Sequence, residues 1–255
     1  MLAECLAAGL GYRCIDRDTI VQRAARNGVS EEELRDAILK PPGFLERFKH
    51  KRYMYLVLFQ ASLVEEVRAG NAVYHGNAGH LLLRGGGPIL RTRVIAPLEF
   101  RTAMAMARLK CSRGEAVSHI QRVDRERRQW THYLYGVDWG DPALYDIVIN
   151  LEHVGIQQAC EVIANMARQR CFEATAGCQQ WMDNLALAAR VRARLALDPA
   201  TSHLEFEVTA GQGRVAIRGK VAGPGELEDV RRIAGSVPGV TELDLDQLPA
   251  GGAGS

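Results

Sequence analysis

The alternation of short apolar runs with helical segments is the feature that most restricts how this chain folds. Four runs have the length and composition of buried strands, at residues 12–15, 72–75, 93–96 and 145–150. Each is followed by a segment with helical periodicity or a helix-capping residue. Strands separated by helices at this spacing favour a parallel sheet with helices on both faces. The first part of the chain is therefore predicted to have an α/β fold.

Two capping-box patterns place helix starts within this part of the chain. Ser30 is followed at the third position by Glu33, and Ser112 is followed in the same way by Glu115. The helix that begins after Ser112 is crowded with arginines, which occupy positions 122, 125, 127 and 128. Guanidinium groups bind phosphate oxygens bidentately and stay charged, so this helix suits a polyphosphate ligand. The alternative is a solvated face on which Asp124 and Glu126 pair with the arginines.

Ligands of parallel α/β sheets bind beyond the carboxyl ends of the strands. The segments 16–19 and 75–79 directly follow two of the predicted strands, and the arginine helix caps the same edge. We therefore expect these three segments to converge on one cleft. This convergence favours phosphate binding over a purely solvated helix face.

Composition excludes several classes of protein. With 255 residues, 47% hydrophobic and 24% charged, the chain is typical of a globular protein with one or two domains. A formal net charge of +2 gives no general case for nucleic-acid binding. No apolar run approaches the roughly 18 residues of a membrane span, and no secretion signal is recognisable, so we expect a cytoplasmic protein without a transmembrane segment. The six cysteines are scattered without metal-site spacing, which predicts reduced thiols and no metal site.

The pattern changes after residue 170. Residues 171–183 are predicted to be a linker, and residues 184–248 to form a small α+β unit of helix, hairpin, helix and strand. Its hairpin strands are expected at 203–208 and 214–219, with Val215 and Ile217 on one face. The tail 249–255 is predicted to be disordered.

Residues 1–170 resemble the cytidylate kinase-like branch of the nucleoside monophosphate kinases, which have a P-loop NTPase fold. Four segments carry the resemblance: GYRCIDRDTI, NAVYHGNAGHLLL, RVIAPLEFR and VDRERRQWTHYLYGVDWGDPALYDIVIN. The last is the most specific, because its lid-like arginines and its distal WGDPALYDIVIN both match in order. The resemblance implies transfer of a phosphoryl group from ATP, with Mg²⁺, to a nucleoside monophosphate.

The same resemblance implies roles for individual residues. It implies that a catalytic lid over the phosphates is formed by Arg122, Asp124, Arg125 and Arg127, in which Asp124 orients one guanidinium. It also implies that the acceptor nucleotide is bound by Asp16, Arg17, His75, Gly76 and Asn77.

Two departures from the family pattern bear on activity. Family members carry a strand and a glycine-rich phosphate-binding loop ahead of the first helix, whereas this sequence is truncated there and begins after both. ATP binding is therefore expected to be weak or lost. In addition, Asn77 stands where the family commonly has an arginine, and His75 occupies the neighbouring position.

Residues 184–248 resemble the BON domain through ALAARVRARLALDP, FEVTAGQGRVAIRGKV and VRRIAGSVPGVTELD. That resemblance implies docking to phospholipid or to a protein partner and supplies no catalytic residues. Three hypotheses follow. The chain is a cytidylate kinase-type phosphotransferase, or it is a non-catalytic nucleotide sensor or scaffold that the BON-like unit delivers to a membrane or protein partner. In the third hypothesis, binding by the BON-like unit is the main activity.

Overall fold

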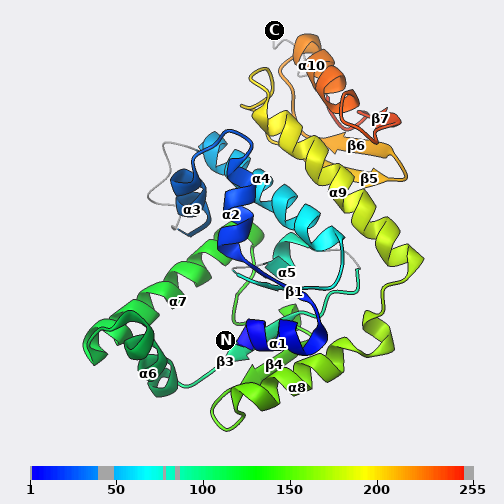
Figure 1. The fold of residues 1–255 in the computed structure, drawn as a ribbon. Helices are drawn as coiled ribbons and strands as arrows, with labels where there is room; N and C mark the ends of the chain where they lie inside the picture. Colours follow the sequence, from blue (N-terminus) through cyan, green and yellow to red (C-terminus); the bar gives the residue numbers. More distant parts are fainter. Residues whose placement is uncertain (1, 40–48, 77–78, 84–86, 250–255) are drawn as a thin grey trace.

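The structure, a computed structural model, describes residues 2–39, 49–76, 79–83 and 87–249 (Figure 1). The first part of the chain contains α1 (Leu2–Leu10), β1 (Arg13–Asp16), α2 (Arg17–Ala25), α3 (Glu31–Leu39), α4 (Lys49–Arg68), β2 (Ala72–His75), α5 (Gly79–Leu82), β3 (Thr92–Ile95), α6 (Leu98–Leu109), α7 (Arg113–Tyr135), β4 (Ile147–Asn150) and α8 (Ile156–Ala167). The second contains α9 (Ala176–Leu197), β5 (Glu207–Gly211), β6 (Arg214–Arg218), α10 (Pro224–Gly235) and β7 (Glu242–Asp244). The α/β class and all four strands of the first part agree with the prediction.

The strands of the first part form two parallel pairs rather than the single sheet that we predicted. β1 pairs with β2, with Asp16 opposite His75 at the carboxyl end. β3 pairs with β4, with Ile95 opposite Asn150. No strand in the described part of the chain lies between β2 and β3, so each of these strands is hydrogen-bonded to a partner strand on one side only. Periodicity identifies strands but not their partners, which is why the sequence did not reveal this division.

One helical layer covers both strand pairs. α1 packs against α8 and against β1 and β2. Its Leu6 belongs to an apolar cluster that also contains Val73 of β2 and Ile149 of β4. α1 therefore bridges the two pairs from one side, and in Figure 1 it lies between β1 and β4.

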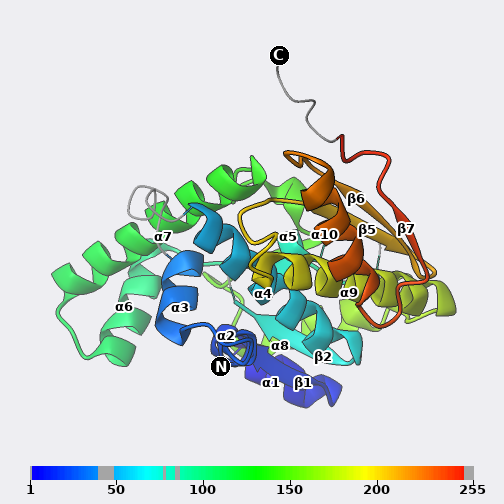
Figure 2. The same cartoon turned by 90° about the horizontal axis from the view of Figure 1, so that it is seen from above.

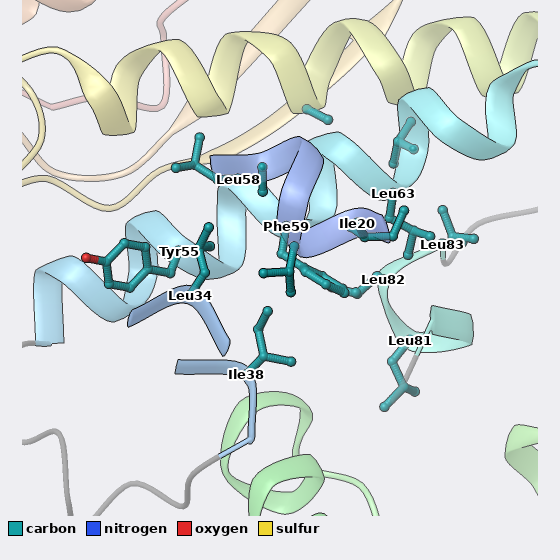
Figure 3. Close-up of a cluster of buried hydrophobic side chains, with 14 of the residues drawn as sticks. Ile20, Leu34, Ile38, Tyr55, Leu58, Phe59, Leu63, Leu81, Leu82 and Leu83 are labelled. Carbon is teal, nitrogen blue, oxygen red and sulfur yellow. The ribbon is translucent and has the colours of Figure 1, made fainter. Parts of the chain in front are cut away.

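The largest core lies around α4. Phe59, Leu58 and Leu63 of α4 are at most 2% exposed and pack against Ile20 of α2 and Leu34 of α3. Figure 3 shows these side chains converging from separate helices, with those of α5 beside them. Helical periodicity in the segment 52–68 predicts this buried stripe.

The C-terminal unit is a three-stranded sheet in the order β5–β6–β7, packed against α9 and α10 (Figure 2). Val215 and Ile217 of β6 are buried, as the alternation predicts. The first strand begins at Glu207 and not at residue 203. The residues before it form turns after α9, in which the Thr201 hydroxyl donates to the Leu195 carbonyl at 2.7 Å.

The prediction of a linker over residues 171–183 is wrong for its second half. Thr175 caps α9 by accepting a hydrogen bond from the Cys178 N–H, and the helix runs without a break from Ala176 to Leu197. Met182 of this early part is buried in the core around α4. The polar first turn of α9 hides this role, because only its later residues show a regular apolar stripe.

α9 packs lengthwise against α4 and joins the two parts of the molecule. Asp183 accepts a hydrogen bond from Arg68 at 2.7 Å. The Tyr53 hydroxyl of α4 donates to the Phe206 carbonyl and accepts from the Phe206 N–H, both at 2.9 Å. Arg192 of α9 also donates to this hydroxyl, at 3.1 Å. One phenol of the first part is thus hydrogen-bonded directly before strand β5.

No disulfide joins the six cysteines, all of which lie among the described residues. None of the described helices has both the length and the apolar character needed to cross a membrane. Most of the predicted disordered tail, residues 250–255, lies outside the described residues.

Candidate functional site

A cavity of about 1830 Å³ opens between the two strand pairs and the helices α6 and α7. Its wall includes His75 and Gly76 at the end of β2 and Ile95 at the end of β3. Asp124 and Arg127 of α7 face it from the other side. The carboxyl ends of strands and the arginine helix therefore meet at one cavity.

A salt bridge holds α6 against α7 at this cavity. Arg101 of α6 donates both terminal nitrogens to the two carboxylate oxygens of Asp124, each at 2.7 Å. Hydrogen bonding to Asp124 raises the pKa of Arg101. The helix that carries Asp124 begins at Ser112, where both hydrogen bonds of the predicted capping box are present. Asp124 thus orients a guanidinium, as expected. That guanidinium belongs to Arg101, which was not singled out from the sequence.

Arg127 presents a cation to the cavity. No hydrogen bond or ion pair joins its guanidinium to another described residue, although much of the side chain is accessible. Desolvation by the surrounding protein lowers the pKa of Arg127, the nearby Asp124 opposes this, and the charges of Arg101 and Arg17 add to the lowering. The guanidinium groups of Arg127, Arg101 and Arg17 therefore lie near one another, with Asp124 paired to Arg101 and Asp18 to Arg17.

Arg122 and Arg125 lie elsewhere on α7 and are not among the residues that line the cavity. Arg122 donates to both oxygens of Glu126 at 3.1 Å and contacts His119. Arg125 is exposed. The structure therefore brings Asp124 and Arg127 together and leaves the other two outside. A role for Arg122 and Arg125 in a moving lid stays a prediction.

Asp16 and Arg17 lie where β1 passes into α2. The carboxylate of Asp16 accepts hydrogen bonds from the N–H and the hydroxyl of Thr19, both at 2.7 Å. These bonds lower the pKa of Asp16, as do the nearby His75 and Arg17. Asp16 is therefore the N-cap of α2. Arg17 forms an ion pair with Asp18 at 3.4 Å, and its Nε is buried without a partner among the described residues.

The Tyr74 ring lies so close to Gly76 that position 76 has no room for a side chain. A Cβ at Gly76 would lie 2.2 Å from the Tyr74 hydroxyl oxygen, so any larger residue would displace the phenol ring. Burial raises the pKa of Tyr74, and its hydroxyl has no hydrogen-bond partner in the described part of the chain. The space that the resemblance assigned to a nucleotide next to Gly76 is thus partly filled by Tyr74. His75 is exposed, and Asn77 lies outside the described residues.

A second group of side chains lies at the cavity, and its arginine, Arg93, was not identified from sequence. Arg93 of β3 donates to the Gly140 carbonyl at 2.6 Å and lies 5.5 Å from the centre of the Tyr145 ring. Trp139 packs edge-on against Tyr145. The connector between α7 and β4 is thereby fixed to the strand edge, which is the packing role that its aromatic residues favour.

The described residues do not fit a protein-held metal ion. They contain no group of three or more His, Cys, Asp or Glu side chains placed to ligate one. The one carboxylate on the α7 side of the cavity, Asp124, already has both oxygens bonded to Arg101. Mg²⁺ in kinases takes one or two carboxylates together with substrate phosphates, so a free carboxylate is needed.

Comparison with known proteins identifies both parts of the chain. Residues 183–248 match the BON domain. A cytidylate kinase from Ignicoccus hospitalis is 29% identical over 168 residues, which cover 65% of this chain and 90% of that protein. A crystal structure of an uncharacterized protein from Eubacterium ventriosum has a similar fold, with a TM-score of 0.51 and 14% identity over 65% of this chain and 88% of the other. These findings support a kinase-like function. Residues 1–153 match the cytidylate kinase-like family, to which this chain therefore belongs.

Proposed function

We propose that the chain binds a nucleoside monophosphate in the cavity between β2, β3 and α7, and that Arg127 contacts its phosphate. One observation carries this proposal: the guanidinium of Arg127 lies on the cavity wall without a described partner, beside the Arg101–Asp124 salt bridge. A second cation, Arg17, is close enough to depress the pKa of Arg127. A dianionic phosphate would relieve the repulsion between these cations and supply the missing hydrogen-bond acceptors.

The chemistry supported by family membership is kinase-type phosphoryl transfer to this acceptor. Such transfer depends on positioning two phosphates in line and on neutralising their charge, with little covalent work by the protein. On this proposal Arg127 neutralises and orients the acceptor phosphate, and Asp124 keeps Arg101 beside it. No step is assigned to Mg²⁺, because both carboxylate oxygens of Asp124, on the α7 side of the cavity, are bonded to Arg101.

Isothermal titration calorimetry with CMP tests this proposal. Arg127→Ala should weaken CMP binding by about tenfold to a hundredfold, the range expected for losing one hydrogen bond between charged groups. Arg113→Ala is the matched control, because it removes the same charge from the same helix but from a side chain that pairs with Glu99 outside the cavity lining. Equal affinities in the two variants would remove Arg127 from the site. Absence of CMP binding in the unaltered protein would refute the proposal itself.

A second candidate is a nucleotide-binding protein without turnover, whose BON domain docks to a phospholipid membrane. The observation in its favour is the engaged state of Asp124, which leaves the cavity able to bind anions but without a free carboxylate on α7. Co-sedimentation of the full chain with anionic liposomes tests the docking, and an assay for ADP and CDP formed from ATP and CMP tests turnover. Turnover would favour the kinase, whereas co-sedimentation without turnover would favour this second candidate.

A further inference from the structure

Two cysteines that are far apart in the sequence lie together between α1 and α8. Cys5 of α1 and Cys160 of α8 belong to the same apolar cluster, and the two helices pack side by side (Figure 1). Cys160 is 4% exposed, whereas Cys5 is half-buried. Neither thiol has a role in the nucleotide site proposed above.

Each of these thiols contacts the helical turn that carries the other. The Sγ atom of Cys160 donates to the Leu2 carbonyl at 3.5 Å, and Leu2 lies three residues before Cys5. The Sγ atom of Cys5 donates to Oε1 of Gln157 at 3.5 Å, and Gln157 lies three residues before Cys160. Residues three apart on a helix are neighbours on one face. The two sulfur atoms therefore face each other across the contact between α1 and α8.

The two thiols differ in how easily a reagent in solution reaches them. Burial, followed by a hydrogen bond with the Cys5 thiol, raises the pKa of Cys160 to about 11. The thiolate is the form of cysteine that attacks a disulfide. An external reagent therefore reaches the half-buried Cys5 first, and Cys160 reacts second, from inside the protein.

We propose that Cys5 and Cys160 form a reversible disulfide, with a low-molecular-weight disulfide such as glutathione disulfide as the oxidant. The Cys5 thiolate attacks one sulfur of glutathione disulfide, which forms a mixed disulfide and releases one glutathione. The Cys160 thiolate then attacks the Cys5 sulfur, which closes the protein disulfide and releases the second glutathione. Two S–H bonds of the protein become one S–S bond, and two electrons and two protons leave in the two molecules of reduced glutathione.

The disulfide ties together two helices that form part of the cavity wall. Leu6 of α1 and Ile163 of α8 both line the cavity. α1 contacts β1 and β2, and the cluster that it shares with α8 includes Ile149 of β4. Oxidation should therefore fix the β1–β2 pair relative to the β3–β4 pair.

Peptide mapping of the full chain tests this proposal directly. The protein is incubated with glutathione disulfide at about pH 8.5, near the ordinary pKa of a thiol, and is then digested with trypsin. Trypsin places Cys5 on the peptide 1–13 and Cys160 on the peptide 129–168, and neither peptide contains another cysteine. We expect mass spectrometry to show these two peptides joined, and dithiothreitol to separate them. If they are never joined, or if Cys5 joins a different cysteine instead, the proposal is overturned.

Three variants test the order of the two steps. In Cys160→Ser the second step cannot occur, so Cys5 should keep one glutathione, which adds the mass of one glutathionyl group to the peptide 1–13. In Cys5→Ser the buried Cys160 should stay unmodified. Cys14→Ser is the matched control, because it removes an exposed cysteine from the neighbouring strand β1 and should leave the joined peptides unchanged. Glutathione on Cys160 in Cys5→Ser would contradict the proposed order.

Thermal unfolding provides a second readout. A disulfide that closes a long loop should raise the Tm of the oxidised protein by about 5–10 °C over that of the reduced protein. The same treatment of Cys5→Ser should leave its Tm unchanged, because the other cysteines do not lie in this contact. An equal rise in Cys5→Ser, or no rise in the unaltered protein, would show that the disulfide does not tie α1 to α8.

Discussion

Replacing Tyr53 by Phe should loosen the contact between the kinase-like part and the BON domain. The Tyr53 hydroxyl makes three hydrogen bonds, two with the backbone of Phe206 and one with Arg192. Phe keeps the aromatic ring, which lies under the Arg192 guanidinium at 5.1 Å, and so removes only the hydroxyl. The three groups that it served would lose their partner.

The expected loss can be worked out from these bonds. Two neutral hydrogen bonds contribute about 1 kcal/mol each and the one from arginine about 2 kcal/mol, or about 4 kcal/mol together. Water replaces part of this because Tyr53 and Arg192 are half-buried, so we expect a loss of about 2 kcal/mol in the free energy of unfolding. For a chain of this size that lowers the Tm by about 4–8 °C.

Differential scanning calorimetry measures the effect, and Tyr133→Phe is the matched control. Tyr133 is 54% exposed, and its ring would keep the cation–π contact with Arg52. The control should therefore change the Tm very little. If Tyr53→Phe shifted the Tm no more than Tyr133→Phe, the hydroxyl would not join the two parts and the reasoning would be refuted.

The remaining predictions concern helix caps. The folded-state pKa of Asp16 is lowered by its bonds to Thr19, so its stabilising effect is present above the unfolded pKa and is lost as pH falls through the folded value. Asp16→Asn should therefore reduce the loss of Tm between pH 5 and about pH 3, near the ordinary Asp pKa. Ser112→Ala removes the capping box with Glu115 and should lower the free energy of unfolding by about 1 kcal/mol in urea titrations, unlike Ser118→Ala at an exposed position of the same helix.

Local features of the fold were predictable from sequence because they depend on neighbouring residues. The bounds of β2 match the prediction, and Ser112 caps α7 with both expected hydrogen bonds. The start of α9 was missed because its first turns are polar and become helical through packing of Met182 on the core. The division into two strand pairs depends on which strands meet, and strand periodicity carries no such information.

The site was predictable in its location but not in its partners. The segment after β2 and the arginine helix do meet at one cavity, whereas no residue of the segment 16–19 is among those that line it. Asp124, however, bonds to Arg101 from a different helix, and Tyr74 fills the space beside Gly76. The first contact joins two different helices, and the second depends on how the Tyr74 ring folds back over Gly76. Residue spacing alone reveals neither.

α9 has a consequence for any attempt to divide this protein. Met182, Ala186 and Ala189 on one side of the helix belong to the core around α4, whereas Leu187 and Val191 on another side belong to the core of the BON domain. A gene cut at residue 183, where the BON match begins, would leave the upstream fragment without part of its wall and give the downstream fragment an uncovered apolar stripe. Either half expressed alone should therefore aggregate. A shorter version of either half should fold only if it contains the whole of α9.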